Sequence, residues 1–316
     1  MKRKLEVAGV DSVADEIISI TLSNPDGTDV DEWSAGAHIE IELPSGLIRH
    51  YSLIGDAHDL SSYRIAVLND RNGRGGSKEL HEIARVGEIF NTSLPRNHFP
   101  LVDSDNYLFI AGGIGITPIF SMIQSIRKDG NIPWKLIYGG RSRTSMAFLS
   151  ELSELSPSRV EIYPEDERGF MPILDTLRQA RTGTAIYCCG PSGLIDAVSR
   201  YAESLELDRS LHVERFSSTA QPSVVKSETS FQVTLASTGE TIEISETESI
   251  LDVVENIRPD VKFSCREGFC GTCETSVIDG IPDHRDTVLT TDEKDGNECM
   301  MICVSRSKTP VLVLDL

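Results

Sequence analysis

Short runs in which apolar and polar residues alternate dominate the first hundred residues. Such runs cover Ile17–Leu22, His38–Leu43 and Tyr63–Leu68, and turn-forming stretches such as Asn24–Gly27 and Pro44–Gly46 lie between them. Alternation of this kind is typical of half-buried strands. Regularly spaced short strands favour a small β-barrel or sandwich, so this first region is predicted to be an all-β domain.

The pattern changes after residue 103 to uniformly apolar runs, each followed by a segment with helical periodicity. Strand–helix alternation indicates a parallel, doubly wound α/β sheet. Such a sheet binds ligands at the carboxyl ends of its strands. The predicted strands are Tyr107–Ala111, Lys135–Tyr138, Val160–Tyr163, Ala185–Cys188 and Leu211–Val213.

A polar, proline-containing stretch at residues 217–226 is predicted to be a linker to a third region, residues 227–316. A chain of 316 residues is too long for one ordinary core, so a multidomain protein is expected. The elements predicted in the third region are strands at Phe231–Leu235, Thr241–Ser245, Cys273–Ile278 and Pro310–Leu316, and a helix at Ser249–Ile257.

Negative charge is concentrated in the third region. The whole chain has a net charge of −19, and residues 227–316, with 18 acidic and 7 basic residues, contribute −11 of it. This excess argues against a nucleic-acid partner. It favours docking on a basic face of another protein, with solubility alone as the alternative explanation.

The chain shows no sign of a membrane or secretory segment. No run of eighteen apolar residues occurs, so no membrane association is expected. The basic start Met1–Lys4 has no apolar stretch behind it, unlike a secretory signal. A cytoplasmic location is therefore predicted, and there the seven cysteines are not expected to form a disulfide framework.

Three cysteines in the third region have the spacing of an iron–sulfur site. Cys265, Cys270 and Cys273 follow the pattern C-x4-C-x2-C, and a fourth cysteine lies farther along the chain. This is the plant-type ligand pattern for a [2Fe–2S] cluster. Three thiolates that converge on two irons need a tight loop, which Gly268 and Gly271 relieve sterically.

The fourth ligand could be either of two later cysteines. Cys299 ends an acidic loop, whereas Cys303 lies in the apolar run Met300–Val304. Four cysteines would also suit a tetrahedral zinc ion, but zinc sites favour two close pairs of cysteines, and here the fourth ligand stands alone.

Two motifs in the first region can bind a phosphate and an aromatic ring. Gly73–Ser77 is glycine-rich and precedes a predicted helix at Lys78–Arg85. A glycine-rich turn that opens a helix presents free amides and the positive end of the helix dipole, although many such turns only start helices. Arg49, Tyr51 and Ser52 offer a cation, an aromatic face and a hydroxyl.

A second glycine-rich stretch, Gly112–Pro118, lies between the first predicted strand and helix of the α/β region. It differs from the G-x-G-x-x-G fingerprint, but a loop of this kind at a helix start can still hold a pyrophosphate. Cys189 ends the fourth strand and Phe216 follows the fifth. Each of these two residues could equally belong to the core.

The acidic run Glu165–Glu167 follows the third strand of that region. Carboxylates there would repel a 2′-phosphate and accept hydrogen bonds from ribose hydroxyls, so NADH is predicted rather than NADPH. Arg141 and Arg143, at the end of the second strand, could hold an extra phosphate and keep NADPH open.

Taken in order, these motifs resemble a reductase of the ferredoxin-reductase superfamily followed by a plant-type ferredoxin. This order resembles the phthalate dioxygenase reductase family, including the vanillate O-demethylase and carnitine monooxygenase reductase subunits. The resemblance covers nearly the whole chain. It implies an FMN-binding β-barrel domain at residues 1–102, an NAD-binding α/β domain at 103–216 and an α+β, β-grasp ferredoxin domain at 227–316. No residue pattern excludes FAD.

The resemblance also implies residue roles, and it favours Cys303 over Cys299 as the fourth ligand. The motif His284-Arg285-Asp286 recurs in the family, but the sequence reveals no physical role for it. The implied FMN-binding residues are Arg49, Tyr51, Ser52, Gly75, Gly76 and Ser77. Those implied for the dinucleotide are Gly113, Gly115 and Thr117, with Glu165 and Asp166 at its ribose. The implied catalytic positions are Cys189 and Phe216. The implied cluster ligands are Cys265, Cys270, Cys273 and Cys303.

The function that follows is electron transfer from NADH through FMN and the [2Fe–2S] cluster to a separate Rieske-type oxygenase. NADH delivers two electrons together and the cluster takes one at a time, so a flavin is needed between them. A general NADH diaphorase without a dedicated oxygenase and a redox sensor are the alternatives. The substrate of the oxygenase cannot be read from this chain.

Overall fold

The computed structural model describes residues 2–316 except residues 72, 74, 129–131, 156–157, 217–229, 264 and 267. The chain divides into two compact units, Met1–Phe216 and Ser217–Leu316. The predicted linker at 217–226 falls outside the described residues, and the predicted domain bounds stay predictions. Within the described ranges, no helix is long and apolar enough to cross a membrane.

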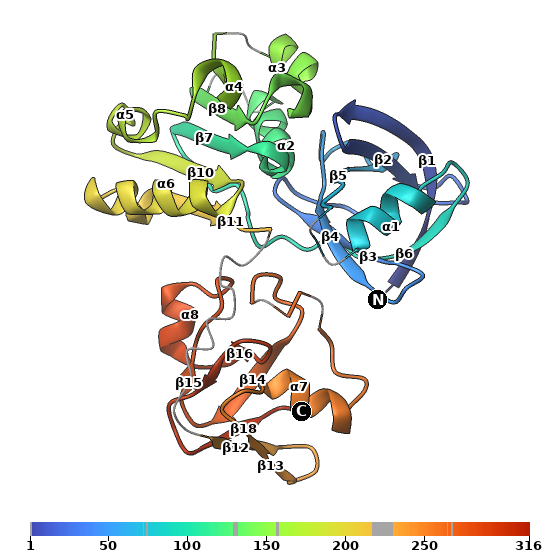
Figure 1. Ribbon diagram of the computed structural model, residues 1–316, viewed down its shortest axis with the longest axis vertical. Helices are drawn as coiled ribbons and strands as arrows, with labels where there is room; N and C mark the ends of the chain where they lie inside the picture. Colours follow the sequence, from blue (N-terminus) through green and yellow to red (C-terminus); the bar gives the residue numbers. More distant parts are fainter. Residues whose placement is uncertain are drawn as a thin grey trace. The chain divides into compact units, whose positions relative to one another are not determined.

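A six-stranded antiparallel sheet opens the first unit, with strand order β4-β3-β6-β1-β2-β5 (Figure 1). Just after β4, the amide of Ile54 donates to the carbonyl of Arg64 in β5 at 2.8 Å, so the two edges meet and the sheet closes into a barrel. The three predicted strands are confirmed as β2, β3 and β5. The elements are β1 Lys2–Ala14, β2 Ile17–Ser23, β3 His38–Glu42, β4 Ile48–Ser52, β5 Tyr63–Leu68, α1 Gly76–Ile83 and β6 Ile89–Ser93.

A five-stranded, all-parallel sheet follows, in the order β11-β10-β7-β8-β9. The chain winds from β7 outward through β8 and β9, then crosses back to β10 on the other side of β7. The direction of winding therefore reverses between β7 and β10, where doubly wound sheets bind their ligands. The elements are β7 Asn106–Gly112, α2 Ile116–Lys128, β8 Trp134–Gly140, α3 Leu149–Leu155, β9 Val160–Pro164, α4 Glu165–Arg168, α5 Ile173–Arg178, β10 Thr184–Cys189, α6 Ser192–Ser204 and β11 Leu211–Glu214, with single 3-10 turns η1 Gly113–Gly115, η2 Arg143–Ser145 and η3 Asp208–Ser210.

The barrel and the parallel sheet share one hydrophobic core. Ile54, Ala66 and Phe99 pack in the same buried cluster as Phe109 of β7 and Ile119 of α2. This continuous apolar contact explains why residues 1–216 behave as a single unit, although they contain two sheets.

The second unit is a mixed sheet in the order β13-β12-β18-β14-β16, in which the central strands β12 and β18 run parallel. Its core is formed by the inward residues of the sheet and by the apolar face of α7. A two-stranded ribbon, β15 with β17, lies beside it. The elements are β12 Phe231–Leu235, β13 Thr241–Ile244, α7 Ile250–Ile257, β14 Glu274–Asp279, β15 Pro282–Asp283, α8 Thr291–Gly296, β16 Cys299–Met301, β17 Arg306–Ser307 and β18 Val311–Leu314.

Candidate functional site

Four buried thiols meet in the second unit. Cys265, Cys270 and Cys273 are each 4% exposed and Cys303 is 7% exposed. The thiol of Cys303 hydrogen-bonds to those of Cys265 and Cys273, and the thiol of Cys270 to that of Cys265. The bond with Cys303 lowers the pKa of Cys273. Four converging soft sulfur donors fit an iron–sulfur cluster, and the structure therefore groups Cys303 with the loop cysteines.

Cys299 has different surroundings. Its side chain is only partly buried and contacts Glu274 of β14. Burial, with the nearby carboxylate of Glu274, raises the pKa of Cys299 to about 11, and its thiol hydrogen-bonds to Glu274, whereas that of Cys303 hydrogen-bonds to Cys265 and Cys273. The geometry thus supports the predicted choice of Cys303.

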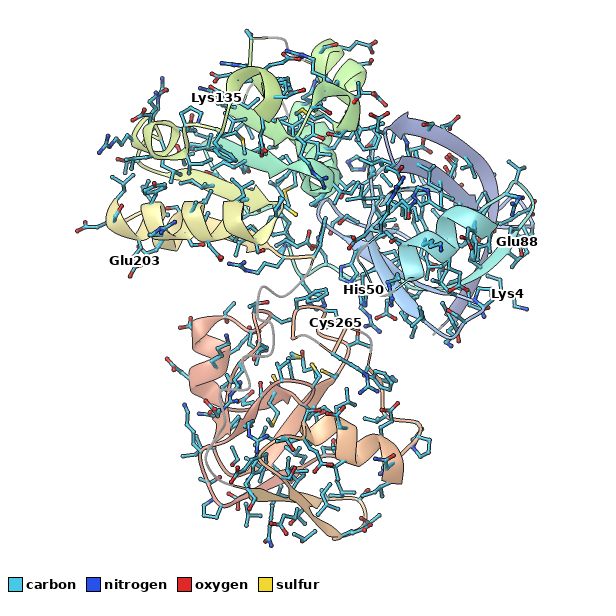
Figure 2. The ribbon with its side chains drawn as sticks, viewed as in Figure 1. Lys4, His50, Glu88, Lys135, Glu203 and Cys265 are labelled. Atoms are coloured by element: carbon cyan, nitrogen blue, oxygen red, sulfur yellow. The ribbon has the colours of Figure 1, made fainter. Side chains whose placement is uncertain are left out.

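The loop that carries three of these cysteines is tightly coiled and anchored on α7. Figure 2 shows Cys265 on this loop. Arg266, Gly268 and Gly271 all have positive φ angles, of 58°, 71° and 73°. A left-handed backbone costs a non-glycine residue about 1–2 kcal/mol, so Arg266 must be held there by other contacts.

The side chain of Arg266 provides these contacts. Its guanidinium donates to Asp252 at 2.8 Å and to Glu255, both on α7, and lies 4.3 Å from the ring centroid of Phe263. Half-exposed ion pairs contribute about 0.2–1 kcal/mol each. Two such pairs and a cation–π contact are of the right size to offset the strained backbone.

In the first unit, Arg49 of β4 lies against the start of α1. A Cβ atom at Gly76 would be only 2.3 Å from Nε of Arg49, so glycine is what allows the helix to start beside the guanidinium. Gly75, at φ 85°, precedes the helix and has no side chain to cap its first amides. A cation, free amides and a helix dipole together form a cradle for a phosphate.

The other predicted flavin residues lie close in sequence to this cradle, and Tyr51 and Ser52 lie on opposite faces of β4. Tyr51 shares the face of β4 with Arg49 because side chains alternate along a strand. Its hydroxyl is buried without a partner among the described residues, and burial raises its pKa. Ser52 is 6% exposed and lies on the opposite face, across from His38. Ser77 accepts the Asp70 amide at 3.1 Å and keeps its own O–H for donation.

The glycine-rich loop after β7 meets the end of β10 where the winding reverses. A Cβ atom at Gly115 would lie 2.3 Å from the carbonyl oxygen of Cys189, so the two loops touch through their backbones. Gly113, at φ 53°, has open space beside it. Thr117 is 2% exposed and donates to the carbonyl of Ile114 at 3.0 Å. Thr117 thus holds the loop in shape, while Gly113 leaves room for a ligand.

Cys189 is fully buried, and burial raises its pKa well above the usual value. Its neighbour in the sheet is Glu214 of β11. Burial raises the pKa of Glu214 to about 8, and its Oε2 has no partner among the described residues. Phe216 follows two residues later and is 37% exposed. Glu214 is a candidate site residue that the sequence did not reveal, because only the pairing of β10 with β11 places it beside Cys189.

The acidic run after β9 forms the short helix α4. Glu165 and Asp166 are exposed there, and the amide of Asp166 donates to the carbonyl of Arg141 at 3.2 Å. Glu167 binds Nε of Arg143 through both carboxylate oxygens, at 2.9 and 3.0 Å. One of the two cations that could hold a 2′-phosphate is therefore already paired.

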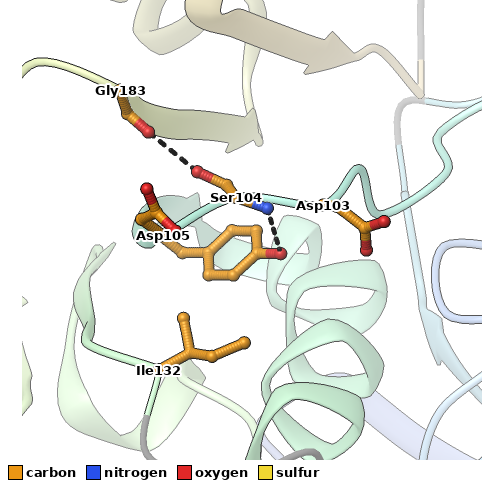
Figure 3. Close-up of a pocket in the computed structure, with 6 residues that line it drawn as sticks. Asp103, Ser104, Asp105, Ile132 and Gly183 are labelled. Atoms are coloured by element: carbon orange, nitrogen blue, oxygen red, sulfur yellow. Dashed lines mark hydrogen bonds between the residues drawn. The ribbon is translucent and has the colours of Figure 1, made fainter.

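A cavity of about 520 Å³ lies at the opposite edge of the parallel sheet, near the amino ends of β7, β8 and β10 (Figure 3). The hydroxyl of Ser104 donates to the carbonyls of Asn106 and Gly183, both at 2.9 Å, and Tyr107 donates to Val102 at 2.8 Å. The polar groups of this wall are used to tie strands together, which marks it as a structural edge.

Two family models match the chain. Residues 233–308 match the 2Fe-2S iron-sulfur cluster binding domain, and this range contains all four converging cysteines. Residues 95–211 match the N-terminal domain of the dimethylamine monooxygenase subunit DmmA-like proteins. The first match confirms the predicted [2Fe–2S] cluster and leaves zinc without support.

Curated relatives match along nearly their whole length. The chain is 41% identical to the phenoxybenzoate dioxygenase subunit beta of Ectopseudomonas oleovorans, over 96% of this chain and 94% of the relative. It is 37% identical to the tetrachlorobenzoquinone reductase of Sphingobium chlorophenolicum, over 99% and 97%. It is also 37% identical to the phthalate dioxygenase reductase of Burkholderia cepacia, again over 99% and 97%.

Solved structures also match along the whole chain. A type IV self-sufficient cytochrome P450 monooxygenase matches with a TM-score of 0.92 and 40% identity, and this chain spans 41% of its length. A phthalate dioxygenase reductase, described as a modular structure for electron transfer from pyridine nucleotides to [2Fe–2S], matches with a TM-score of 0.74 and 35% identity over 98% of its length.

These comparisons confirm the predicted multidomain fold class and the predicted oxidoreductase activity. They agree with the predicted cofactor set of FMN, NADH and a [2Fe–2S] cluster. The chain belongs to the phthalate dioxygenase reductase family of flavin- and iron–sulfur-dependent oxidoreductases.

Proposed function

We propose that this protein is the reductase component of a two-component oxygenase of the Rieske type. It takes electrons from NADH, passes them through FMN to the [2Fe–2S] cluster and delivers them singly to the oxygenase. The observation that carries this proposal is one chain that combines a four-thiol site with two glycine-rich phosphate sites. Relatives named as a dioxygenase subunit and a dioxygenase reductase support an oxygenase as the acceptor.

The residues of the chain bind and orient the carriers. A bound flavin accepts an electron pair and releases single electrons. Arg49 and the start of α1 hold the FMN phosphate, and Tyr51, on the same face of β4 as Arg49, contacts its ring, whereas the buried side chain of Ser52 lies on the opposite face. The loop of Gly113 and Gly115 holds the nicotinamide dinucleotide where the winding of the sheet reverses.

The nicotinamide and flavin rings need an uncharged, water-excluding protein surface beside them, because hydride transfer is favoured by close contact without water. Cys189 meets this need, since its thiol is fully buried and its raised pKa keeps it uncharged. Phe216, partly exposed just beyond β11, is proposed to cover the flavin. Glu165 and Asp166 are proposed to accept from the ribose of NADH.

A two-electron quinone reductase is the second candidate. The 37% identity to a tetrachlorobenzoquinone reductase favours it. In that activity the flavin would reduce a small acceptor directly, and the cluster would not be needed.

Replacement of Cys270 by serine separates the two functions. We expect Cys270→Ser to abolish NADH-dependent reduction of cytochrome c, because single electrons leave through the cluster, while NADH still bleaches the flavin absorbance. The control Cys299→Ser should keep the visible cluster spectrum and full cytochrome c reduction, whereas Cys303→Ser should lose both. Cytochrome c reduction that survives Cys270→Ser would contradict the proposed route, and undiminished quinone reduction would favour the second candidate.

A further inference from the structure

The segment His284–Leu289 joins β15 to α8 and contains the motif to which the sequence assigned no role. Arg285 and Thr287 are exposed, but two polar side chains of the segment are buried. The side chain of Asp286 has no exposed surface and that of His284 is 6% exposed. Loops normally lie at the surface, where water satisfies their polar groups. The buried polar groups of this segment must therefore hydrogen-bond to other parts of the protein.

One of its contacts is with the cysteine loop. Thr287 donates its amide to the carbonyl of Gly268 at 2.9 Å, and its hydroxyl lies 3.4 Å from the same oxygen. A Cβ atom at Gly268 would lie 3.2 Å from Cα of Asp286 and 2.5 Å from the side chain of Val304. Gly268 is thus enclosed between the segment and the residue that follows Cys303.

A second contact reaches the turn between β16 and β17, which carries Cys303. Arg285 donates its amide to the hydroxyl of Ser305 at 3.2 Å, and Ser305 is fully buried. The same short segment therefore touches both stretches of chain that supply thiols, one through Thr287 and the other through Arg285.

The carboxylate of Asp286 gives the segment its shape. Its Oδ2 accepts the amides of Val288 and Leu289 at 3.1 and 2.9 Å, which folds the chain back on itself. Lys294 of α8 donates to the carbonyl of Asp286 at 2.7 Å and lies 3.9 Å from Oδ2. The buried carboxylate of Asp286 is therefore held by two backbone amide donors and lies near the ammonium group of Lys294.

We propose that His284–Leu289 is a strap that holds the two thiol-bearing stretches in register around the cluster, and that Asp286 is its positioning residue. Removal of the carboxylate frees the amides of Val288 and Leu289 and loosens the strap. The charge of Asp286 also lies beside the cluster loop, so it helps to set the cluster's reduction potential, which depends on net charge and hydrogen bonding. The inference rests on the proposed cluster ligands Cys265, Cys270, Cys273 and Cys303.

The test compares Asp286→Ala and Asp286→Asn in the full-length holoprotein, with Asp292→Ala and Asp292→Asn, at an exposed position in α8, as matched controls. For each variant we measure the iron and sulfide content, the visible circular dichroism spectrum, the midpoint potential of the cluster and the rate at which an iron chelator bleaches it. We expect Asp286→Ala to bleach at least about five-fold faster, as loss of a buried hydrogen bond implies, with unchanged flavin content. Asp286→Asn should restore cluster content, because its side-chain oxygen still accepts, but raise the midpoint potential.

If Asp286→Ala does not accumulate in folded form, Ser305→Ala tests whether the strap stabilises the cluster, since it removes only the acceptor of the Arg285 amide. Faster bleaching of Ser305→Ala than of the Asp292 variants supports the strap. Bleaching rates and potentials equal to those of the Asp292 variants overturn it. Failure of the ligand assignment would appear separately, as a normal cluster spectrum in Cys303→Ser.

Discussion

At the scale of single residues, burial strongly perturbs the carboxyl group of Glu214 in the first unit. Burial raises its pKa from 4.5 to about 8, so folding keeps a proton on it that the unfolded chain has lost at neutral pH. Below pH 4.5 both states are protonated and burial of this group carries no pH-dependent penalty. As the pH rises from 4.5 to about 8, the free-energy cost of folding with Glu214 protonated grows, and above about pH 8 this cost is constant.

We therefore expect Glu214→Gln to stabilise the first unit at high pH relative to low pH. The Tm of the variant minus that of the natural protein should increase between pH 5 and pH 8 and then level off. Tryptophan fluorescence isolates the relevant transition, because both tryptophans, Trp33 and Trp134, lie in the first unit. The exposed control Glu203→Gln should give a difference that does not change with pH, and a flat profile for Glu214→Gln would contradict the assignment.

Residues whose chemistry needs a fixed spacing could be predicted from the sequence. Cys265, Cys270 and Cys273 were found because three ligands from one loop leave a local pattern. Glu214 left no pattern, because only the pairing of β11 with β10 places it beside Cys189. The motif that contains Asp286 was noticed, but its role could not be predicted because it depends on packing against Gly268. The spacing left Cys299 and Cys303 both open as the fourth ligand, because they lie at similar distances along the chain from the loop, and only the family resemblance favoured Cys303.

At the scale of elements, we propose that the start of α4 sets the preference between NADH and NADPH. The helix exposes Glu165 and Asp166 immediately after β9, and Glu167 pairs with Arg143. A 2′-phosphate placed there would meet the exposed carboxylates of Glu165 and Asp166 at the carboxyl end of β9, the edge strand of the sheet. Repulsion between surface charges a few ångströms apart is about 1 kcal/mol for each pair.

We expect the natural protein to have a ratio of kcat/KM for NADH over NADPH well above one. The double variant Glu165→Gln, Asp166→Asn should lower this ratio by about ten-fold, mainly through KM for NADPH. Glu154→Gln, an exposed change in α3, serves as the control. A ratio below one for the natural protein would reverse the assignment of NADH.

Elements with a clear period were predicted better than those without one. The apolar strands β7, β8 and β10 and the alternating strands β2, β3 and β5 were expected close to their observed positions. The long strand β1 was missed because its apolar and polar residues do not alternate regularly and only Leu5 and Val7 are buried. Helix α1 begins at Gly76, two residues earlier than expected, since Gly75 adopts the left-handed conformation that turns the chain into the helix.

At the scale of the whole molecule, charge is distributed unevenly between the two units. The region of the cluster carries −11 of the total of −19. An acidic electron-donating unit is steered towards a basic surface, and salt screens that attraction over about 10 Å at moderate ionic strength.

Turnover with the partner oxygenase should therefore fall as ionic strength rises. Bleaching of the flavin by NADH, measured in the same buffers, is the control, because it does not involve docking of the second unit. We expect the ratio of oxygenase turnover to flavin reduction to decline by about ten-fold or more between low and high salt. A ratio that stays constant would show that charge does not guide the encounter.

The parallel pairing of β12 with β18 has a consequence for biosynthesis. β18 lies between β12 and β14 in the sheet, although almost eighty residues separate it from β12 along the chain. While a ribosome is still making residues 236–310, the centre of that sheet is missing and the three loop cysteines have no finished scaffold. The first unit, whose strands all precede residue 217, can fold during translation. Delivery of iron and sulfide by assembly machinery is thus a late, post-translational event, and a nascent chain stalled before β18 should emerge with its barrel formed and its cluster absent.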